Sequence, residues 1–438
     1  MRSAVVIGSG LAGLTSARHL AEAGIDVTVL EAGRRLGGRM RTVDAHGVLV
    51  DVGATFFTDF YPRAMSLLDT CGLRRELIPF PLAAGVEHGG TVTPVWPVAD
   101  FLRGGLLSPM SLARLGAGTL RLVPGWSSLD PGDLLRAVRY DTRTAESWVR
   151  EVLGDEVADL LIAPVLRGVV HWELGTTSQA VLFSMMKAVT KYRGAYRLRD
   201  GMSSLCERLG ASLDVRCSTR VTSVTRSGDR WLVDAETRGA ERQLEADGLI
   251  CATTASVVPK LFPDFTHEQR AFFEGIRYSS TVVAVVRAPA RRERPHTSIL
   301  FARTSESPPL AGITPAGSEH ASDTETVKIS LTDAAYQSVA GLPDRELGRF
   351  ILDTARRNRA LTSWLADADV VEVVRWEEAL PVFDVGHLRT IRQWQSAPQL
   401  PALAFAGDYL AGPYVEGAIR SGADAAAVLL AELSSPPR

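Results

Sequence analysis

The chain has 438 residues, of which 46% are hydrophobic and 22% are charged, and this composition is typical of a globular protein, which excludes a disordered or fibrous chain. Its formal net charge of −2 excludes a global attraction to nucleic acid or to an anionic membrane. Because no run of eighteen uninterrupted apolar residues occurs, we expect no membrane span.

The four cysteines are scattered along the chain, with no CxxC pair and no histidine at zinc spacing. We therefore predict no metal site, and we expect reduced thiols in a cytoplasmic protein. Arginine outnumbers lysine 44 to 4, which favours a bacterial source with a GC-rich genome.

The first elements form a βαβ unit. Residues 4–7 are a fully apolar run, a helical pattern follows from Leu11 and ends at Gly24, and residues 27–30 form the next strand. Between the first strand and the helix stands GSGLAG, residues 8–13. Its glycines allow a tight turn, backbone approach to a pyrophosphate and close packing of helix on strand.

Glu31 ends the second strand, 18 residues beyond Gly13. A carboxylate at this place accepts the ribose hydroxyls of a dinucleotide and disfavours a 2′-phosphate. The phrase RRLGGR follows, in which Gly38 permits close backbone approach and Arg39 supplies a cation for the diphosphate. The sequence therefore predicts dinucleotide binding.

Further along the chain, residues 48–52 are predicted as a third strand and residues 62–72 as a helix. From about residue 80 to 193 the pattern is mainly helical, and we interpret it as an inserted helical layer. Within this layer, residues 101–123 are apolar with interspersed arginines. We expect a helix pair there and no membrane contact, although contact with lipid stays open.

Strands return in the second half of the chain. Residues 249–252 rejoin the first sheet, residues 278–382 form a second excursion that contains a sheet, and residues 403–406 are a buried strand before a last helix from Gly417. Further strands are predicted at residues 220–226, 230–236, 281–286, 327–331 and 370–374. The nucleotide-binding domain is thus assembled from three separated pieces.

Several phrases occur in an order that resembles the flavin amine oxidase, protoporphyrinogen oxidase and phytoene desaturase superfamily. They are GSGLAG, EAGRRLGGR, DVGATFF, GMSSLCERL, ADGLICAT, RWEEALPVFDVGH and the closing GDYLAGPYVEGAIRSG, together with Val221. The resemblance implies an α/β fold, with a Rossmann-like FAD-binding domain of the GR2 type and an inserted α+β substrate domain. We expect the FAD-binding domain at residues 1–78, 195–275 and 385–438, and the substrate domain at 79–194 and 276–384.

The resemblance also implies the cofactor contacts. Val221 would hold the adenine through its backbone, Asp408 the ribityl chain and Val415 the pyrimidine edge of the flavin. The last helix would direct its positive end at the charge that gathers near flavin N1 on reduction. Many relatives have a basic residue where this chain has Gly33, so that contact is in doubt. The full expected set is Gly8, Gly10, Leu11, Ala12, Gly13, Glu31, Gly38, Arg39, Ala54, Thr55, Val221, Gly407, Asp408, Val415 and Ala418.

Three aromatic residues are candidates for the walls of the flavin site. By resemblance, Tyr414 would face the flavin, and Phe57 and Phe383 would form opposite walls, although core packing explains these two equally well. Amine oxidases of the superfamily carry a lysine on a substrate-domain strand, and the matching place here is Ala284. That absence favours porphyrinogen oxidases and desaturases.

Other polar candidates are ambiguous at this stage. His387 suits packing or capping better than a role as a base. Arg167, Arg197 and Arg199 could meet a substrate carboxylate, but a solvated face explains each of them as well.

The implied function is an FAD-dependent oxidoreductase, an oxidase or desaturase that removes a hydride from a C–N or C–C bond of a mostly apolar small molecule, conceivably in specialised metabolism. Since no second GxGxxG unit for a nicotinamide occurs, the electrons would pass to dioxygen or another acceptor. The alternatives are a porphyrinogen oxidase of haem biosynthesis, an amine oxidase and a non-redox flavoprotein. We expect no nucleic-acid partner, and the oligomeric state stays open.

Overall fold

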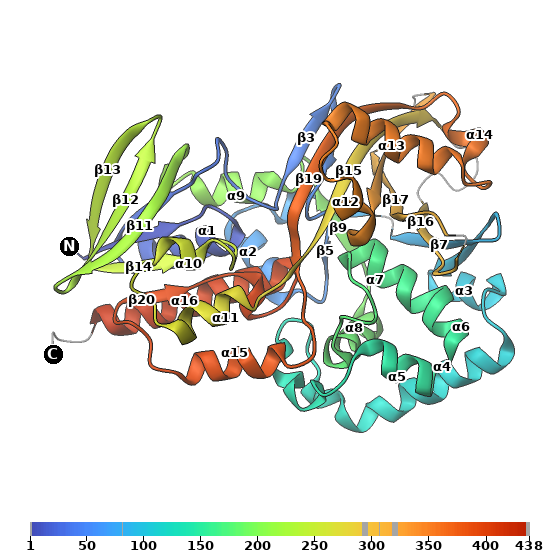
Figure 1. Cartoon of the computed structure of the whole chain (residues 1–438), viewed down its shortest axis with the longest axis horizontal. Coiled ribbons are helices and arrows are strands. Elements are labelled where there is room, and N and C mark those ends of the chain that lie inside the picture. The colour runs from blue at the N-terminus through green and yellow to red at the C-terminus, as the bar shows by residue number, and fades with distance from the viewer. Residues whose placement is uncertain (1, 81, 291–296, 306, 318–322, 435–438) are drawn as a thin grey trace.

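The computed structural model describes residues 2–80, 82–290, 297–305, 307–317 and 323–434. Its first layer is a parallel sheet of five strands in the order β10-β2-β1-β14-β20, and both ends of the chain lie at this side of the molecule (Figure 1). These strands are mostly apolar because both faces of the sheet are covered. Their bounds are β1 Ser3–Ile7, β2 Asp26–Leu30, β10 Asp214–Arg216, β14 Gly248–Cys251 and β20 Leu403–Phe405.

Two helices from opposite ends of the chain cover one face of this sheet. They are α1 (Leu11–Glu22) and α16 (Val415–Ser434), and they share one apolar cluster with β1, β2, β14 and β20. A small antiparallel sheet and two helices cover the other face. These are β11 Thr219–Ser227, β12 Arg230–Thr237, β13 Ala240–Ala246, α10 Val258–Leu261 and α11 His267–Glu274.

Helices α1 and α16 approach closely because α16 carries a glycine at the contact. A methyl group on Gly422 would overlap the carbonyl oxygen of Ala12 in α1. Gly422→Ala is therefore expected to lower the free energy of unfolding by about 2–3 kcal/mol through overpacking. Chemical denaturation measures this change.

Gly116 provides the matched control, because it lies in the exposed middle of α4 (Pro109–Leu122) and no atom lies within 4 Å of its missing side chain. Gly116→Ala is expected to raise the free energy of unfolding by up to about 1 kcal/mol through helix propensity. Equal effects of the two substitutions would contradict the role of Gly422.

A second, larger sheet has seven strands in the order β19-β15-β18-β17-β16-β7-β8, and its neighbours are antiparallel except for β16 and β7. Its strands are β7 Ala83–His88, β8 Thr91–Trp96, β15 Tyr278–Pro289, β16 Thr297–Phe301, β17 Leu310–Gly317, β18 Thr324–Leu331 and β19 Asp369–Pro381. Helices α12 (Asp333–Val339), α13 (Asp344–Arg356) and α14 (Thr362–Leu365) cover one face, and the hairpin of β3 (Thr42–Ala45) and β4 (Val48–Asp51) packs on the other.

A helical layer lies below this sheet in Figure 1. It contains α3 Val98–Gly104, α4, α5 Ala145–Val152, α6 Asp155–Val157, α7 Ala163–Val170 and α8 Gln179–Lys191. The connecting elements are β5 Phe57–Thr58, α2 Pro62–Thr70, β6 Leu77–Phe80, β9 Ala195–Leu198, α9 Ser203–Gly210 and α15 His387–Ser396. None of the described helices combines the length and apolar character that crossing a bilayer requires.

The structure confirms the α/β fold and the predicted strands around residues 4–7, 27–30, 249–251 and 403–405. It corrects three details. Residues 48–51 pair with residues 42–45 in a hairpin and not with the parallel sheet, whose outer strands are β10 and β20. Residues 83–96 form a hairpin within the region expected to be helical, and the last helix begins at Val415, two residues earlier than expected.

Candidate active site

The two glycine-rich ends of the chain meet through an ion pair. Arg39 Nη2 lies 2.8 Å from Asp408 Oδ1, although the two residues are 369 positions apart. Arg39 Nη1 also donates to the Ala379 carbonyl at 3.0 Å, and its guanidinium lies 5.9 Å from the centre of the Tyr278 ring. The first motif, the last motif and β19 therefore converge on one place, as the expected FAD contacts require.

The three glycines of the first motif differ in their surroundings. A methyl group on Gly8, whose φ is +100°, would lie 2.9 Å from the Ala252 carbonyl oxygen, and one on Gly13 would overlap the Gly8 carbonyl. Around Gly10, at the N-terminus of α1, no atom lies within 4 Å of that position. Gly8 and Gly13 thus serve the packing, whereas Gly10 faces open space that fits an approaching pyrophosphate.

Glu31 lies directly beside this turn. Its Oε2 accepts from the Ser9 amide at 2.9 Å and the Ser9 hydroxyl at 2.7 Å, and its Oε1 accepts from the Gly33 amide at 2.6 Å. A methyl group on Gly33 would lie 2.9 Å from Oε1, at the end of the flexible Glu31 side chain. A β-bulge just after Val221 interrupts the ladder of β11 near the place where the adenine contact is expected.

The start of α16 is fixed from two sides. The Gly407 amide donates to the Ser421 hydroxyl at 2.9 Å. Glu416, which is 2% exposed, accepts from the amides of Arg63 at 3.0 Å and Ala64 at 2.9 Å, at the beginning of α2. The remaining expected contacts lie around this point and the first motif: Leu11, Ala12, Gly38, Ala54, Val415 and Ala418.

The candidate wall residues have different exposures. Tyr414 is partly exposed, and its ring stacks on Tyr61 with the centroids 6.1 Å apart. The rings of Phe57 and Phe383 are fully buried, and Phe383 packs against Trp172 and His387. A residue that forms a cavity wall must be partly exposed. Of the three candidate wall residues, only Tyr414 meets this condition.

Comparisons with known proteins agree with this geometry. A family model described as "Flavin containing amine oxidoreductase" matches residues 11–430. The chain belongs to the flavin containing amine oxidoreductases. Its cofactor is therefore FAD, and it is an FAD-dependent oxidoreductase.

Similar proteins of this family include enzymes with different substrates in their names. The chain is 26% identical to a coproporphyrinogen III oxidase of Mycobacterium tuberculosis, covering 94% of this chain and 93% of that protein. It is 25% identical to a putrescine oxidase of Kocuria rosea, covering 98% and 95%. Cyclohexylamine oxidase from Brevibacterium oxydans has the same fold, with a TM-score of 0.76, 18% identity and coverage of 99% and 100%.

One lysine lies beside Thr55, an expected FAD contact, on a strand that was predicted from the sequence without a role for its lysine. Ala284 faces α13, so a side chain there points away from the site. On the neighbouring strand β18, Lys328 is 8% exposed, and its Nζ donates to the Asp51 carbonyl at 2.6 Å and to Thr55 Oγ1 at 2.8 Å. Its signal in the sequence was a lone lysine within the apolar run of residues 327–331.

Burial lowers the pKa of Lys328 to about 8 from its usual 10.5. Because the unfolded chain binds this proton more tightly, the stabilising contribution is fully present above pH 10.5 and is lost as the pH falls through about 8. Relative to Lys328→Met, wild-type apoprotein should gain about 3 kcal/mol of unfolding free energy between pH 8 and pH 10.5. Parallel denaturation curves at the two pH values measure this difference, and a constant difference would contradict it.

The other polar candidates are mostly committed to structural contacts. His387 is 5% exposed, and its Nε2 pairs with the Tyr409 carbonyl at 3.2 Å. Arg167 binds Glu173 with two nitrogens, at 2.7 and 2.8 Å. Arg199 lies 3.7 Å from Glu76. Of the candidates for a substrate carboxylate, Arg197 is thus the one for which the structure shows no ion pair within the described residues.

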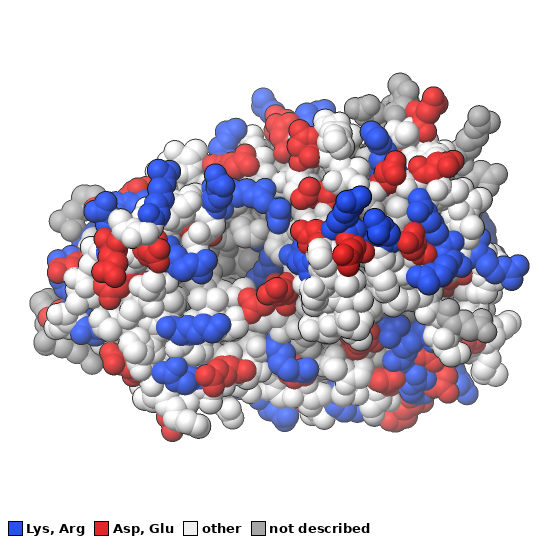
Figure 2. Space-filling model, turned by 45° about the horizontal axis from the view of Figure 1, so that its top comes forward, with Lys and Arg blue, Asp and Glu red and all other residues white. Residues whose placement is uncertain are grey.

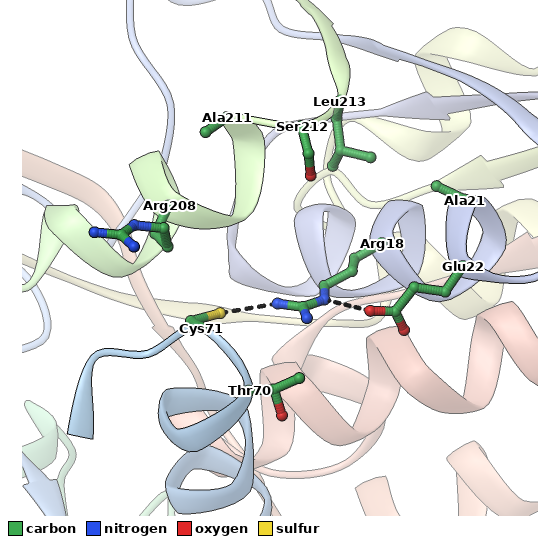
Figure 3. Close-up of a pocket in the computed structure, with 9 residues that line it drawn as sticks. All are labelled: Arg18, Ala21, Glu22, Thr70, Cys71, Arg208, Ala211, Ser212 and Leu213. Atoms are coloured by element: carbon green, nitrogen blue, oxygen red, sulfur yellow. Dashed lines mark hydrogen bonds and ion pairs between the residues drawn. The ribbon is translucent and has the colours of Figure 1, made fainter.

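Among the hollows at the surface of the described residues, two bear on where the active site lies. Figure 2 shows a recess between the part formed by β11–β13 and the part formed by β15 and β19, with charges of both signs at its rim. A pocket of about 500 Å³ lies at the opposite end of α1 from the glycine motif (Figure 3). There Arg18 donates to Glu22 and to the Cys71 sulfur. The pocket lies at the C-terminal ends of α1, α2 and α9, where cations such as Arg18 and Arg208 offset the negative ends of the helix dipoles. We therefore place the active site at Arg39 and Asp408, and not in this pocket.

Proposed function

We propose that this flavoprotein is a cytoplasmic oxidase that removes a hydride from a C–N or C–C bond of a mostly apolar small molecule. The observation that carries the proposal is the convergence of the glycine motif, the Arg39–Asp408 ion pair and the partly exposed Tyr414. Tyr414 packs against both the helical layer and the cluster around α2 and α9. It therefore stands where a substrate held by the helical layer would meet the cofactor.

The protein residues have positioning and electrostatic roles in this proposal. When bound, FAD would supply the hydride acceptor, and the electrons would leave to dioxygen or another acceptor. Arg39 and Asp408 hold the cofactor's polar middle, and the amides at the start of α16 offset negative charge near its pyrimidine edge. Tyr414 and Tyr61 present a flat apolar surface that orients the substrate and excludes water.

A porphyrinogen oxidase is the second candidate. It is supported by the match to coproporphyrinogen III oxidases along nearly the whole chain. The similarly extensive match to putrescine oxidase supports an amine oxidase. The three functions share the cofactor site and differ in the substrate.

Anaerobic titration of the holoenzyme with amines, porphyrinogens and polyenes separates these functions. We expect the flavin absorbance to be lost with at least one apolar substrate and to recover when dioxygen is readmitted. Bleaching by coproporphyrinogen alone would select the second candidate. If dithionite reduces the flavin but no member of the panel does, the oxidase proposal is wrong and a non-redox role is favoured.

A further inference from the structure

Three basic side chains that interact through their charges have no role in the hydride transfer proposed above, and one of them, Lys328, contacts Thr55. They are Lys328 on β18, His171 directly after α7, and Arg197 on β9. Figure 1 shows α7, β9 and the neighbouring α12 in the centre of the molecule, where the large sheet meets the helical layer. We call these three side chains the basic cluster.

Lys328 contributes one unused hydrogen-bond donor. Its ammonium has three protons, and two of them point to the Asp51 carbonyl and Thr55 Oγ1. For the third proton the structure shows no acceptor within the described residues. Since Thr55 is an expected FAD contact, this donor lies beside the expected cofactor site.

His171 contributes a second donor. Its backbone has a φ of +54°, because His171 ends α7 in the left-handed conformation common at helix C-termini. Its Nδ1 is buried and has no hydrogen-bond partner within the described residues, while the residue as a whole is partly exposed. Burial and the charge of Lys328 lower the pKa of His171 to about 4, so the ring is neutral at pH 7.

The tautomer of this neutral ring follows from the buried nitrogen. An orphaned acceptor is tolerated better than an orphaned N–H group, so Nδ1 carries the lone pair and Nε2 carries the proton. His171 therefore presents an Nε2–H donor on its exposed side.

Arg197 supplies the third group of donors. It is half-buried, and its charge acts on both Lys328 and Asp51. The acidic groups nearby are already satisfied elsewhere. Asp51 accepts from Thr42 Oγ1 at 2.7 Å and the Met202 amide at 2.8 Å.

The other acid that faces the cluster is Asp333 in the first turn of α12, which accepts from the amide and hydroxyl of Ser280. The groups of the basic cluster that lack a hydrogen-bond partner within the described residues and face the site are therefore donors. Two of the three side chains, Lys328 and Arg197, carry positive charge. A ligand group that satisfies such a set is an anionic acceptor of two oxygens.

We propose that His171, Lys328 and Arg197 bind a carboxylate of the substrate, so that the enzyme acts on a mostly apolar acid. This inference rests on the proposed function, because it places the acid beside the flavin. It narrows the substrate class: a neutral hydrocarbon would leave the three donors unpaired, and a substrate amine would face like charges.

Equilibrium binding of carboxylate probes to the oxidised holoenzyme tests the inference. Benzoate and octanoate are titrated against the flavin spectrum, with benzamide and octanamide as neutral isosteres. We expect each carboxylate to bind about tenfold or more tightly than its amide, and Arg197→Met to weaken carboxylate binding by at least about tenfold. His171→Gln, which retains a donor, should keep most of the affinity that His171→Leu loses.

Arg199→Met is the matched control, because Arg199 is near in sequence but its side chain is 63% exposed and lies against Glu76. It should leave carboxylate binding unchanged within about twofold, and FAD content and melting temperature show that each variant is folded. Absence of carboxylate binding, equal binding of acid and amide, or an equal effect of Arg197→Met and Arg199→Met would overturn the inference. Carboxylate binding without bleaching by any substrate would instead contradict the oxidase proposal alone.

Discussion

Gly10→Ala is expected to weaken FAD binding by about tenfold or more, which corresponds to at least about 1.4 kcal/mol, and to leave the stability of the apoprotein nearly unchanged. The backbone of Gly10 has φ −66° and ψ 171°, which alanine adopts without strain. No protein atom lies within 4 Å of the added methyl group. The space it fills is the one in which we expect the pyrophosphate to approach the helix N-terminus. FAD titration and thermal unfolding of the apoprotein measure the two effects separately.

Gly13→Ala is the matched control for this prediction. Its methyl group would overlap the Gly8 carbonyl oxygen and lie 3.1 Å from the Ala252 side chain, so it should destabilise the apoprotein by about 2 kcal/mol or more. Its loss of FAD would then follow from loss of folding. Wild-type FAD affinity in Gly10→Ala would show that the pyrophosphate binds elsewhere.

The cofactor half of the site could be predicted from the sequence because its signals are local. GSGLAG, Glu31 and the closing segment each combine a strand, a turn and a helix start within a few residues, and their order implies one elongated ligand. The ion pair between Arg39 and Asp408 is not local in this sense, because 369 positions of the sequence separate the two residues. The resemblance implied that each of the two contacts FAD, but it did not predict that they pair with each other.

The substrate half could not be predicted in the same way. Strand β10 has three residues, and the β7–β8 hairpin lies between helical patterns, so neither gives a long periodic signal. Lys328 and His171 are 157 positions apart, and their proximity depends on how β18 and α7 pack. A lysine inside an apolar strand was the one available hint, because such a charge is rarely buried without a use.

Breaking the Arg39–Asp408 ion pair is expected to cost about 3–5 kcal/mol of unfolding free energy when Arg39 alone is replaced by methionine. The side chain of Asp408 is 7% exposed, so its carboxylate would remain buried without a cation. Asp408→Asn should cost less, because Arg39 is 31% exposed and keeps its bond to the Ala379 carbonyl. The double variant should be more stable than the sum of the single losses predicts, by about 1–3 kcal/mol. Denaturation of the four apoproteins measures this coupling.

An exposed ion pair of similar length separates this effect from a general effect of charge removal. Arg230 and Glu245 lie 2.9 Å apart with side chains 45% and 54% exposed, so Glu245→Gln should cost less than about 1 kcal/mol. The Arg39 variants should also bind FAD more weakly, and more so the more stability they lose. The reason is that the same ion pair joins the first and last motifs at the expected cofactor site. If the coupling between Arg39 and Asp408 equals that of the exposed pair, the two ends of the chain are held together by the parallel sheet, the packing of α1 on α16 and the hydrogen bonds of Glu416. The ion pair would then serve the cofactor and not the fold.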